Sequence, residues 1–403
     1  MDAGSAVPPS RGLSRAAERP ALDTIASYPS IPSQTQVSAP LDLATGELLQ
    51  AFDSLAKWEL QNVARRYLDA GHRLSFCHRV RKADDSVQVR MASEQPRAFY
   101  AGLQTCGLVW LCPVCAPKIQ AVRAAELKLA IEHASAEGLH VDMVVLTIPH
   151  GRRDDLRELV AGFRKAYASM TQSRAYRELA AELGLVGTVV SHEVTWGEGS
   201  GWHPHAHVLR FRERGGPPAP SGELHDHDAR LFEMWRRAVE RRGLGKPTVR
   251  AFRVQDARQA HEYVQKLARA GRFAWGIDDE MVRSHSKRGR EGRFSPFDLL
   301  RQGAEGTEGP WRELWRTYAA VYKGSRQLVW SNGLKRRLGA SEGRTDSEIA
   351  ESIGERYVWA RILTDDDWAL VRRHKARGVL LQVAELAGRD GIELYLSELR
   401  KEK

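Results

Sequence analysis

The stretch Gly201-Trp202-His203-Pro204-His205-Ala206-His207-Val208-Leu209-Arg210-Phe211 places three histidines at alternating positions and then runs into an apolar segment. Such a segment is typical of a β-strand. Side chains two residues apart in a strand share a face, about 6.5–7 Å apart along the backbone, so two imidazoles can converge on one metal ion. Pro204 donates no backbone hydrogen bond, and we expect the regular strand to begin after it.

His205 and His207 are therefore the predicted metal ligands, with His203 as a further candidate. The alternative is a set of solvated histidines on a strand edge. Histidine is the commonest imidazole metal ligand, and clustering of histidines within a few residues favours the metal site.

The composition of the chain indicates what kind of partner it binds and in which cellular compartment it works. The chain has 403 residues, a formal net charge of +10 and a sequence pI near 9.5, which favours a polyanionic partner such as nucleic acid or an anionic surface. No apolar run reaches the ~18 residues needed to span a bilayer. The first residues lack the apolar segment of a secretory signal. We therefore expect a cytoplasmic protein without a membrane partner, whose four cysteines are reduced and available to metal.

Hydrophobic periodicity predicts strands at 141–148, 186–196 and 248–254, with the histidine strand hairpinned to the second of them. Helical patterns surround these strands, and one of them, at 256–270, has Asp256 as a plausible N-cap. This order predicts an α+β fold in which an antiparallel sheet packs against flanking helices.

The chain divides into five predicted parts along its length. They are a disordered tail at 1–45, an N-terminal helix with a cysteine-rich zinc-binding insert at 46–138, a catalytic domain at 139–275, a basic DNA-contacting extension at 276–345, and a helical C-terminal region at 346–403.

Glu193 lies on the strand that is hairpinned to the histidine strand. Its carboxylate is predicted to complete a site of two histidines and one carboxylate, which suits a catalytic divalent metal with open positions. The alternative is an exposed hairpin glutamate. In a regular strand the neighbouring His192 should point to the opposite face.

The four cysteines predict a second, structural site. Cys112 and Cys115 form a Cys-x-x-Cys knuckle, Cys106 precedes it, and Cys77 is the fourth candidate. Four thiolates form a closed tetrahedral zinc site. His78 is adjacent to Cys77 and is the alternative fourth ligand.

Tyr263 and Lys266 lie three residues apart in a predicted helix and would share a face. A phenol has a pKa near 10 and needs help to act as a nucleophile, which a metal that polarises the phosphate and a nearby ammonium would supply. A helical tyrosine alone is more often a packing residue.

These motifs together resemble the rolling-circle replication initiators of bacterial plasmids, which belong to the HUH endonucleases. The resemblance covers residues 75–350. It rests on four motifs in order: Cys106-Gly-Leu-Val-Trp-Leu-Cys112-Pro-Val-Cys115, the histidine stretch with the upstream Glu193-Val-Thr, Tyr263-Val-Gln-Lys266, and Tyr322-Lys-Gly-Ser-Arg-Gln-Leu-Val-Trp-Ser331. Ala206 is smaller than the residue usually found between the two histidines of the pattern.

The resemblance implies an HUH endonuclease fold and a metal-dependent DNA strand transferase. His205, His207 and Glu193 would hold Mg²⁺ or Mn²⁺, and Tyr263 would attack one strand of a plasmid origin. The products would be a 5′-phosphotyrosine link and a free 3′-hydroxyl for the host polymerase, with the host helicase as a further partner. The cysteines would hold structural Zn²⁺.

One tyrosine is consumed in the first cleavage, so a second cleavage needs another nucleophile. Family members with one tyrosine place a glutamate four residues before it, where this chain has Gln259, which cannot act as a base. We expect Tyr263 of another protomer in a homo-oligomer to act, with Glu262 as the less favoured alternative.

Basic segments interleaved with aromatic residues are predicted to contact single-stranded origin DNA through phosphates and base stacking. The candidate residues are Lys287, Arg288, Arg290, Lys323, Arg326 and Trp330. Two other functions remain open. A histidine-triad nucleotide hydrolase also fits the His-x-His-x-His pattern, and a DNA-binding regulator with an inactive nuclease site fits the charge.

Overall fold

The computed structural model describes residues 45–93, 97–215, 224–256, 292–340, 343–352 and 357–402. The predicted tail lies outside these residues up to residue 44. The predicted helix at 256–270 also lies outside them, apart from Asp256.

The central sheet is built on a long hairpin that joins β4 (Leu185–Gly197) and β5 (Gly201–Arg212). On the other side of β5 lies β3 (His140–Thr147), whose apolar and β-branched residues predicted a buried strand. Shorter strands complete the sheet in the order β6-β3-β5-β4-β7, with β8 also beside β4. The bounds of these three are β6 (Phe252–Asp256), β7 (Arg293–Phe294) and β8 (Leu328–Trp330). All pairings are antiparallel, which confirms the predicted α+β class.

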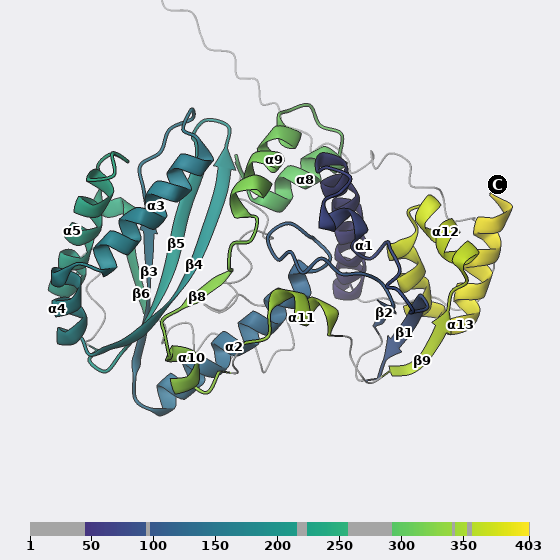
Figure 1. The fold of residues 1–403 in the computed structure, drawn as a ribbon, viewed down its shortest axis with the longest axis horizontal. Coiled ribbons are helices and arrows are strands. Elements are labelled where there is room, and N and C mark those ends of the chain that lie inside the picture. Colours follow the sequence, from purple (N-terminus) through teal and green to yellow (C-terminus); the bar gives the residue numbers. More distant parts are fainter. Residues whose placement is uncertain are drawn as a thin grey trace, which may run out of the picture. The chain divides into compact units, whose positions relative to one another are not determined.

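Helices cover one face of this sheet (Figure 1). Asp155 and Ser173 cap α3 (Leu156–Thr171) and α4 (Arg174–Glu182) by accepting backbone N–H bonds, which replaces partners missing in the first turn. Phe163 of α3 and Trp235 of α5 (Asp226–Glu240) meet at 5.0 Å between ring centroids. The same apolar cluster includes residues of α8 (Pro296–Ala304) and α9 (Trp311–Tyr322).

A smaller apolar cluster fills the opposite face at the end of the sheet where β3 begins. It joins Leu209 and Phe211 of β5 to Leu127 of α2 (Ala116–Ala136) and Leu334 of α10 (Leu334–Arg337). The cluster does not extend to the other end of this face, where His205 and His207 lie.

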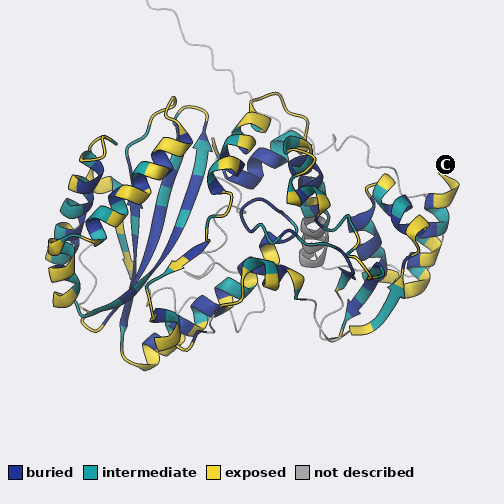
Figure 2. Ribbon diagram, viewed as in Figure 1, coloured by how far each residue is buried: buried dark blue, intermediate teal, exposed yellow. Residues whose placement is uncertain are grey.

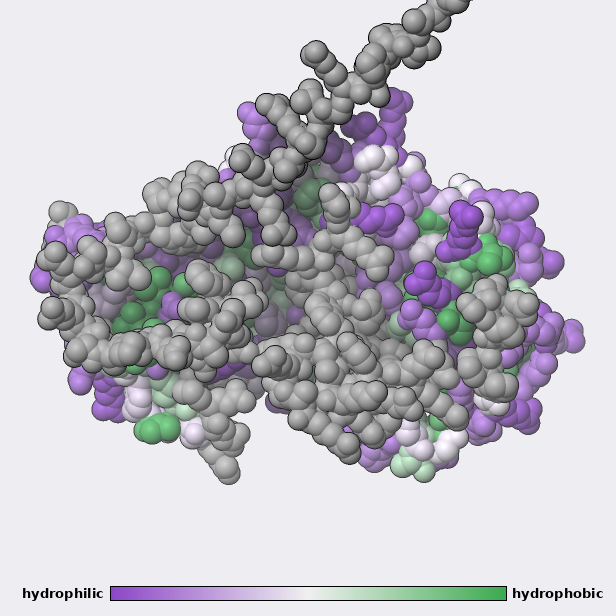
Figure 3. Space-filling model, turned by 180° about the vertical axis from the view of Figure 1, so that it is seen from behind, coloured by the Kyte–Doolittle hydropathy of each residue, from purple (hydrophilic) through white to green (hydrophobic). Residues whose placement is uncertain are grey.

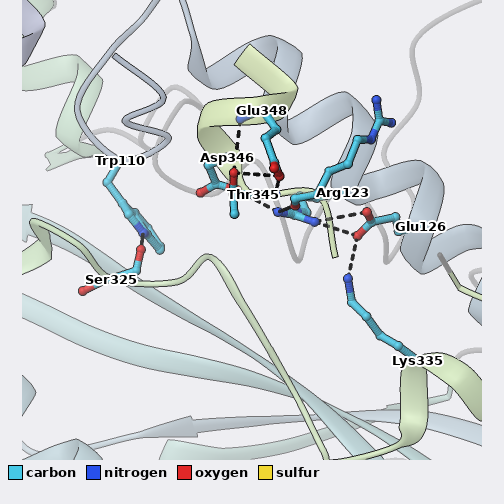
Figure 4. A network of polar contacts seen from close by, with 9 residues as sticks. Trp110, Arg123, Glu126, Ser325, Lys335, Thr345, Asp346 and Glu348 are labelled. Carbon is cyan, nitrogen blue, oxygen red and sulfur yellow. Dashed lines mark hydrogen bonds and ion pairs between the residues drawn. The ribbon is translucent and has the colours of Figure 1, made fainter. Parts of the chain in front are cut away.

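Charged residues fix α2 to segments that are far away in the sequence (Figure 4). Glu126 accepts from Lys335, at 3.0 Å, and from Arg123, which also contacts Asp346 of α11 (Asp346–Glu351) at 2.9 Å. Glu126 is buried, so these pairs are less screened than surface pairs. The network therefore holds the segment after β8 against the helix that begins at the cysteine knuckle.

A second sheet has the order β2-β1-β9. Its strands are β1 (Gln88–Ala92), β2 (Ala98–Ala101) and β9 (Tyr357–Ile362). They pack with three helices around Trp58, Tyr100 and Trp368. The helices are α1 (Thr45–Tyr67), α12 (Asp365–Arg373) and α13 (Arg377–Lys401). The region predicted as helical at the C-terminus thus also contains a strand, β9, whose partner β1 lies in the part predicted as the N-terminal helix and zinc-binding insert.

Two predicted boundaries were wrong. β5 begins at Gly201 and includes Pro204. The proline is tolerated because β3 ends opposite His205, so at Pro204 only β4 pairs with β5 and no hydrogen bond is needed on the other side. The strand predicted at 248–254 is β6, which begins only at Phe252 and ends at Asp256, whose backbone pairs with Asp142 of β3. The helix that Asp256 is predicted to cap lies outside the described residues. The short 3-10 turns Arg73–Phe76 and Val249–Ala251 complete the described elements.

Burial follows the two sheets and the inner sides of their helices (Figure 2). Hydrophilic residues cover most of the described surface on the face seen in Figure 3, with hydrophobic residues in separate small patches. Among the described helices, none has the length and apolar character to cross a membrane. By its internal contacts, Leu48–Lys403 forms one compact unit, and Met1–Glu47 is assigned to another.

Candidate metal centres

The hairpin register brings the carboxylate and the two histidines together. Glu193 of β4 pairs directly with His205 of β5, and Ser191 pairs with His207. Because side chains alternate along a strand, all three ligand candidates project from one face. His205 Nε2 lies 2.9 Å from Glu193 Oε2, and His207 Nε2 lies 3.4 Å from Glu193 Oε1. One ligand atom from each residue can be chosen so that all three lie within 4.8 Å of one another.

The opposite face at these positions is filled by packing. His192 points to that face, as predicted, and its ring contacts Phe163 of α3 at 5.8 Å between centroids. Ala206 is fully buried in the same apolar cluster, so the smaller residue of the histidine motif occupies a packed position. Burial lowers the pKa of His192 to about 4, helped by Arg164, and keeps this histidine neutral.

The site holds a negative charge in a partly buried position. Burial raises the pKa of Glu193, but the charge of His207 and the hydrogen bond from His205 outweigh burial and lower it overall. Glu193 is therefore ionised at neutral pH. The exposed fractions are 14% for the His205 side chain and 8% for Glu193, so solvent reaches the group at its edge.

This donor set fits a divalent metal. Two imidazole nitrogens and one carboxylate form a set of three ligands that leaves coordination positions open, as catalytic metal sites do. The three side chains converge on one point, and the carboxylate contacts both rings. The geometry thus agrees with the predicted ligands Glu193, His205 and His207.

His203 belongs to a second pair beside this group. Its Nδ1 lies 2.6 Å from His150 Nε2, and His150 Nδ1 lies 3.0 Å from the carbonyl oxygen of Ser200. A carbonyl can only accept, so His150 Nδ1–H donates to Ser200, and a neutral His150 then accepts at Nε2 from His203 Nδ1–H. This assignment leaves His203 with a bare Nε2. Burial and the neighbours His205 and His150 lower the pKa of His203 to about 3.

His203 is outside the converging group of three, and its role as a metal ligand stays a prediction. His150 was missed in the sequence, where it is an isolated histidine two residues beyond a predicted strand. No spacing signal links it to the histidine motif, because the contact depends on how the loop after β3 folds back on the hairpin. Gly201 has φ +74°, and an added Cβ there would lie 2.7 Å from the Gly151 carbonyl oxygen, so this loop packs closely on the hairpin turn.

The four cysteines form a separate buried cluster. The Cys77 sulfur lies 3.4 Å from that of Cys115 and 3.7 Å from that of Cys112, and the Cys106 sulfur lies 3.8 Å from that of Cys115. Disulfide sulfurs would lie about 2.05 Å apart. Four sulfurs at the zinc–thiolate distance of about 2.3 Å stand about 3.8 Å apart in a regular tetrahedron. All four cysteines are buried, and the cluster fits a closed tetrahedral metal site.

Cys77 completes this cluster, so the alternative ligand His78 is not needed. The ring of His78 instead contacts Trp58 at 5.6 Å between centroids. Cys115 directly precedes α2, which places its sulfur at the start of a helix.

The predicted nucleophile Tyr263 and its neighbours Lys266 and Glu262 lie outside the described residues. Two other tyrosines, Tyr318 and Tyr322, stack on each other at 4.9 Å in α9, and both are fully buried. Burial raises the pKa of both phenols, and Glu193 raises that of Tyr322 further. Tyr318 also donates to the Trp110 carbonyl at 3.0 Å. These two side chains serve packing and are poor candidates for attack on DNA.

The predicted DNA contacts fall into three groups. Lys287, Arg288 and Arg290 lie outside the described residues. Lys323 and Arg326 are exposed and stay candidates. Trp330 lies in β8, paired with Val189 of β4, and the Lys335 ammonium lies 5.2 Å from its ring centroid. One side of this indole is therefore already occupied by a cation.

Comparison with known proteins gives two relatives, both from Streptomyces. The chain is 27% identical to protein rep of Streptomyces lividans, over 72% of this chain and 77% of that protein. It is 31% identical to the neomycin resistance protein of Streptomyces cyanogenus, over 28% of this chain and 31% of that protein. No protein-family model and no solved structure matches the chain.

Proposed function

We propose that this protein is a plasmid replication initiator of the HUH type, which cuts one strand of origin DNA and stays linked to its 5′ end. The similarity to protein rep over most of both chains supports a replication protein. The observation that carries the nuclease proposal is the convergence of Glu193, His205 and His207 on one face of the sheet.

Glu193, His205 and His207 would hold the Mg²⁺ or Mn²⁺ ion. The bound ion would polarise a DNA phosphate and offset the negative charge that develops on it during attack. The hairpin supplies two neighbouring strands with a fixed register, so the ligands need little reorganisation. The exposed Arg152 and Arg153 follow Gly151, which packs on the hairpin turn, and they add positive charge at this end of the sheet.

Tyr263 is the proposed nucleophile. In the proposed step its phenolic oxygen bonds to phosphorus and gives up its proton, while the bond from phosphorus to the 3′ oxygen breaks. The 3′ oxygen takes up a proton and becomes the free hydroxyl that a polymerase extends. Lys266 would favour the phenolate by its charge, and Glu262 or Tyr263 of a second protomer would serve the second cleavage.

The length of chain between the end of β6 and Tyr263 limits how far this tyrosine can lie from the metal ligands. Asp256 is paired with Asp142, whereas His205 is paired with Thr147, five residues further along β3. With β6 and β5 on either side of β3, Asp256 and His205 are about 19 Å apart at ~3.3 Å per residue and ~4.8 Å per strand. Tyr263 follows Asp256 by seven residues, which span up to about 24 Å when extended and about 10 Å in the predicted helix, so in a helix the side chains of Tyr263 and His205 would have to bridge the rest.

The test uses 3′-labelled single-stranded oligonucleotides tiled over the replicon that carries the gene, incubated with the full chain and Mn²⁺. We expect a labelled covalent adduct that survives denaturing electrophoresis and maps to Tyr263. Tyr263→Phe should remove the adduct and keep DNA binding, whereas Tyr322→Phe should keep both.

Other outcomes would contradict the proposal. An adduct on a different tyrosine would show that the nucleophile is wrong. Hydrolysis of nucleotides without an adduct would indicate a histidine-triad hydrolase. Bound but uncut DNA across the whole replicon, with Mn²⁺ present, would indicate a regulator.

A further inference from the structure

A buried arginine from the C-terminal helix lies next to the cysteine cluster. Arg377 is 1% exposed, and its guanidinium donates to Gln61 Oε1 at 2.7 Å, to the His78 carbonyl at 3.0 Å and to Asn62 Oδ1 at 2.9 Å. All three partners are neutral. Among the described residues, no carboxylate pairs with this guanidinium, and its Nε has no hydrogen-bond partner.

A buried charge without an opposite charge is costly, because the ion loses its hydration without gaining an opposite charge in return. The ring of Trp58, 4.9 Å from the guanidinium, supplies a cation–π contact that offsets part of this cost. The amide oxygens that accept these hydrogen bonds are neutral and carry only a partial negative charge. The described environment of Arg377 therefore lacks its counter-charge.

Gln61 connects this arginine to the cysteines. The Gln61 oxygen accepts from Arg377, and the Gln61 Nε2 donates to the Cys112 sulfur at 3.3 Å. An N–H bond to sulfur is strongest when the sulfur is a thiolate. Four thiolates around a divalent ion carry a net charge of about −2, from four single negative charges and one double positive charge.

We infer that Arg377 is the counter-cation of the cysteine metal site and positions Cys112 through Gln61. The metal–thiolate group and the guanidinium would stabilise each other, and the C-terminal helix α13 would be fixed to the N-terminal cysteine cluster by charge as well as by packing. Burial lowers the pKa of Arg377 to about 10, so the guanidinium stays protonated at neutral pH. Cys77 and Cys112 raise this pKa and so favour the charged form.

This inference does not depend on the nuclease proposal. It concerns residues that hold the metal ligands, and partners of this kind change metal affinity by about 10- to 100-fold when removed. A purely structural Arg377 would stabilise the protein equally with and without metal. A counter-cation stabilises only the metal-loaded protein, since without metal it is a buried charge without a partner.

The experiment compares the full chain with Arg377→Met, Arg377→Lys and Gln61→Leu. Zn²⁺ affinity is measured by competition with a chromophoric chelator, and Co²⁺ absorption reports whether four sulfurs still bind tetrahedrally. Arg373→Met is the matched control, because Arg373 is exposed at the end of the neighbouring α12.

We expect Arg377→Met to weaken Zn²⁺ binding by about 10- to 100-fold. Arg377→Lys should recover part of the loss by its charge, Gln61→Leu should lose affinity by breaking the bridge, and the control should stay within about twofold of the wild type. Urea unfolding of the zinc-loaded and metal-free proteins should place the destabilisation by Arg377→Met in the zinc-loaded form alone.

Two results would overturn the inference. One is an Arg377→Met protein that binds Zn²⁺ within about twofold of the wild type. The other is an equal loss of stability with and without metal. If Arg377→Met does not fold even with zinc, the milder Arg377→Lys and Gln61→Leu carry the same comparison, and unchanged affinity in Gln61→Leu would exclude the bridge.

Discussion

The two candidate metal centres differ in ligands, burial and neighbours. The cysteine cluster has four identical soft ligands on all sides and no side that is open to solvent. The group of Glu193, His205 and His207 has three harder ligands, lies on a sheet face and keeps part of His205 exposed. The first arrangement completes a tetrahedron by itself, whereas the second leaves positions for water or a substrate oxygen. Saturation of the ligand set therefore distinguishes the candidate structural site from the candidate catalytic site.

The largest effect should follow from Cys112→Ala. Structural zinc contributes about 10–16 kcal/mol in small zinc domains, and removing one thiolate opens the tetrahedron. We expect loss of about one zinc per chain and destabilisation of the N-terminal half, measured by metal analysis and by urea unfolding followed by circular dichroism. His207→Ala should keep its zinc, and zinc loss in both variants would break the proposed division of roles.

Glu193→Gln should abolish cleavage while the fold is kept. The amide retains the shape but not the charge, and a catalytic metal supplies several kcal/mol of stabilisation, so a loss of about 10³-fold or more is expected. Adduct formation and DNA binding are measured side by side. Full cleavage in the variant, or insensitivity of the wild type to EDTA, would contradict the metal assignment.

A buried ion-pair cluster away from both metal centres offers a variant that should lose stability without losing metal. Asp142 accepts from Arg210 at 2.6 Å and 2.8 Å and from Arg212 at 2.5 Å, all buried, at the end of β3 and β5 remote from the histidines. Asp142→Asn leaves the buried Arg210 with Asp228 as its remaining carboxylate partner and removes the carboxylate partner of Arg212, and breaking a buried pair costs about 3–5 kcal/mol. We expect a lower urea midpoint with unchanged zinc content. The exposed Asp226→Asn is the control, and equal effects would mean that the buried pairs contribute little.

The smallest effect concerns acid. Burial raises the pKa of Asp142, but Arg210 and Arg212 outweigh burial and lower it below its usual value of 3.8. A depressed folded pKa contributes stability that is present above the unfolded pKa and is lost as the pH falls through the folded one. The free energy of unfolding should therefore decrease as the pH falls below about 4, and the decrease should be smaller in Asp142→Asn. Parallel curves for the two proteins would remove this explanation.

The sequence predicted the local parts of the structure well. The hairpin of β4 and β5 has strong alternation and a glycine-rich turn, so register and face follow from a short segment, and the convergence of Glu193 with the histidines follows from the register. The cysteine knuckle was visible by spacing alone. Cys77 was the least secure ligand because nothing in the spacing fixes its distance to the others.

The parts that were missed depend on distant segments. β9 pairs with β1 across more than 260 residues, and no local pattern shows such a pairing. His150 reaches His203 only because the loop after β3 folds on the hairpin turn. Arg377 gave no signal, since a single arginine in a helix is ordinary until its burial is known. Whether the segment with Tyr263 reaches the metal ligands stays a prediction.

The pairing of β9 with β1, together with Arg377, has a consequence for synthesis on the ribosome. All four cysteines are translated by residue 115, but Arg377 is added 262 residues later. At about 5–20 residues per second, this interval is about 13–52 s. During that time the nascent chain would have its metal ligands without their counter-charge, and the sheet of β1 and β2 would have an open edge. Release of a chain truncated before β9 would therefore expose the unpaired edge of β1. The C-terminal residues thus protect the N-terminal sheet from aggregation.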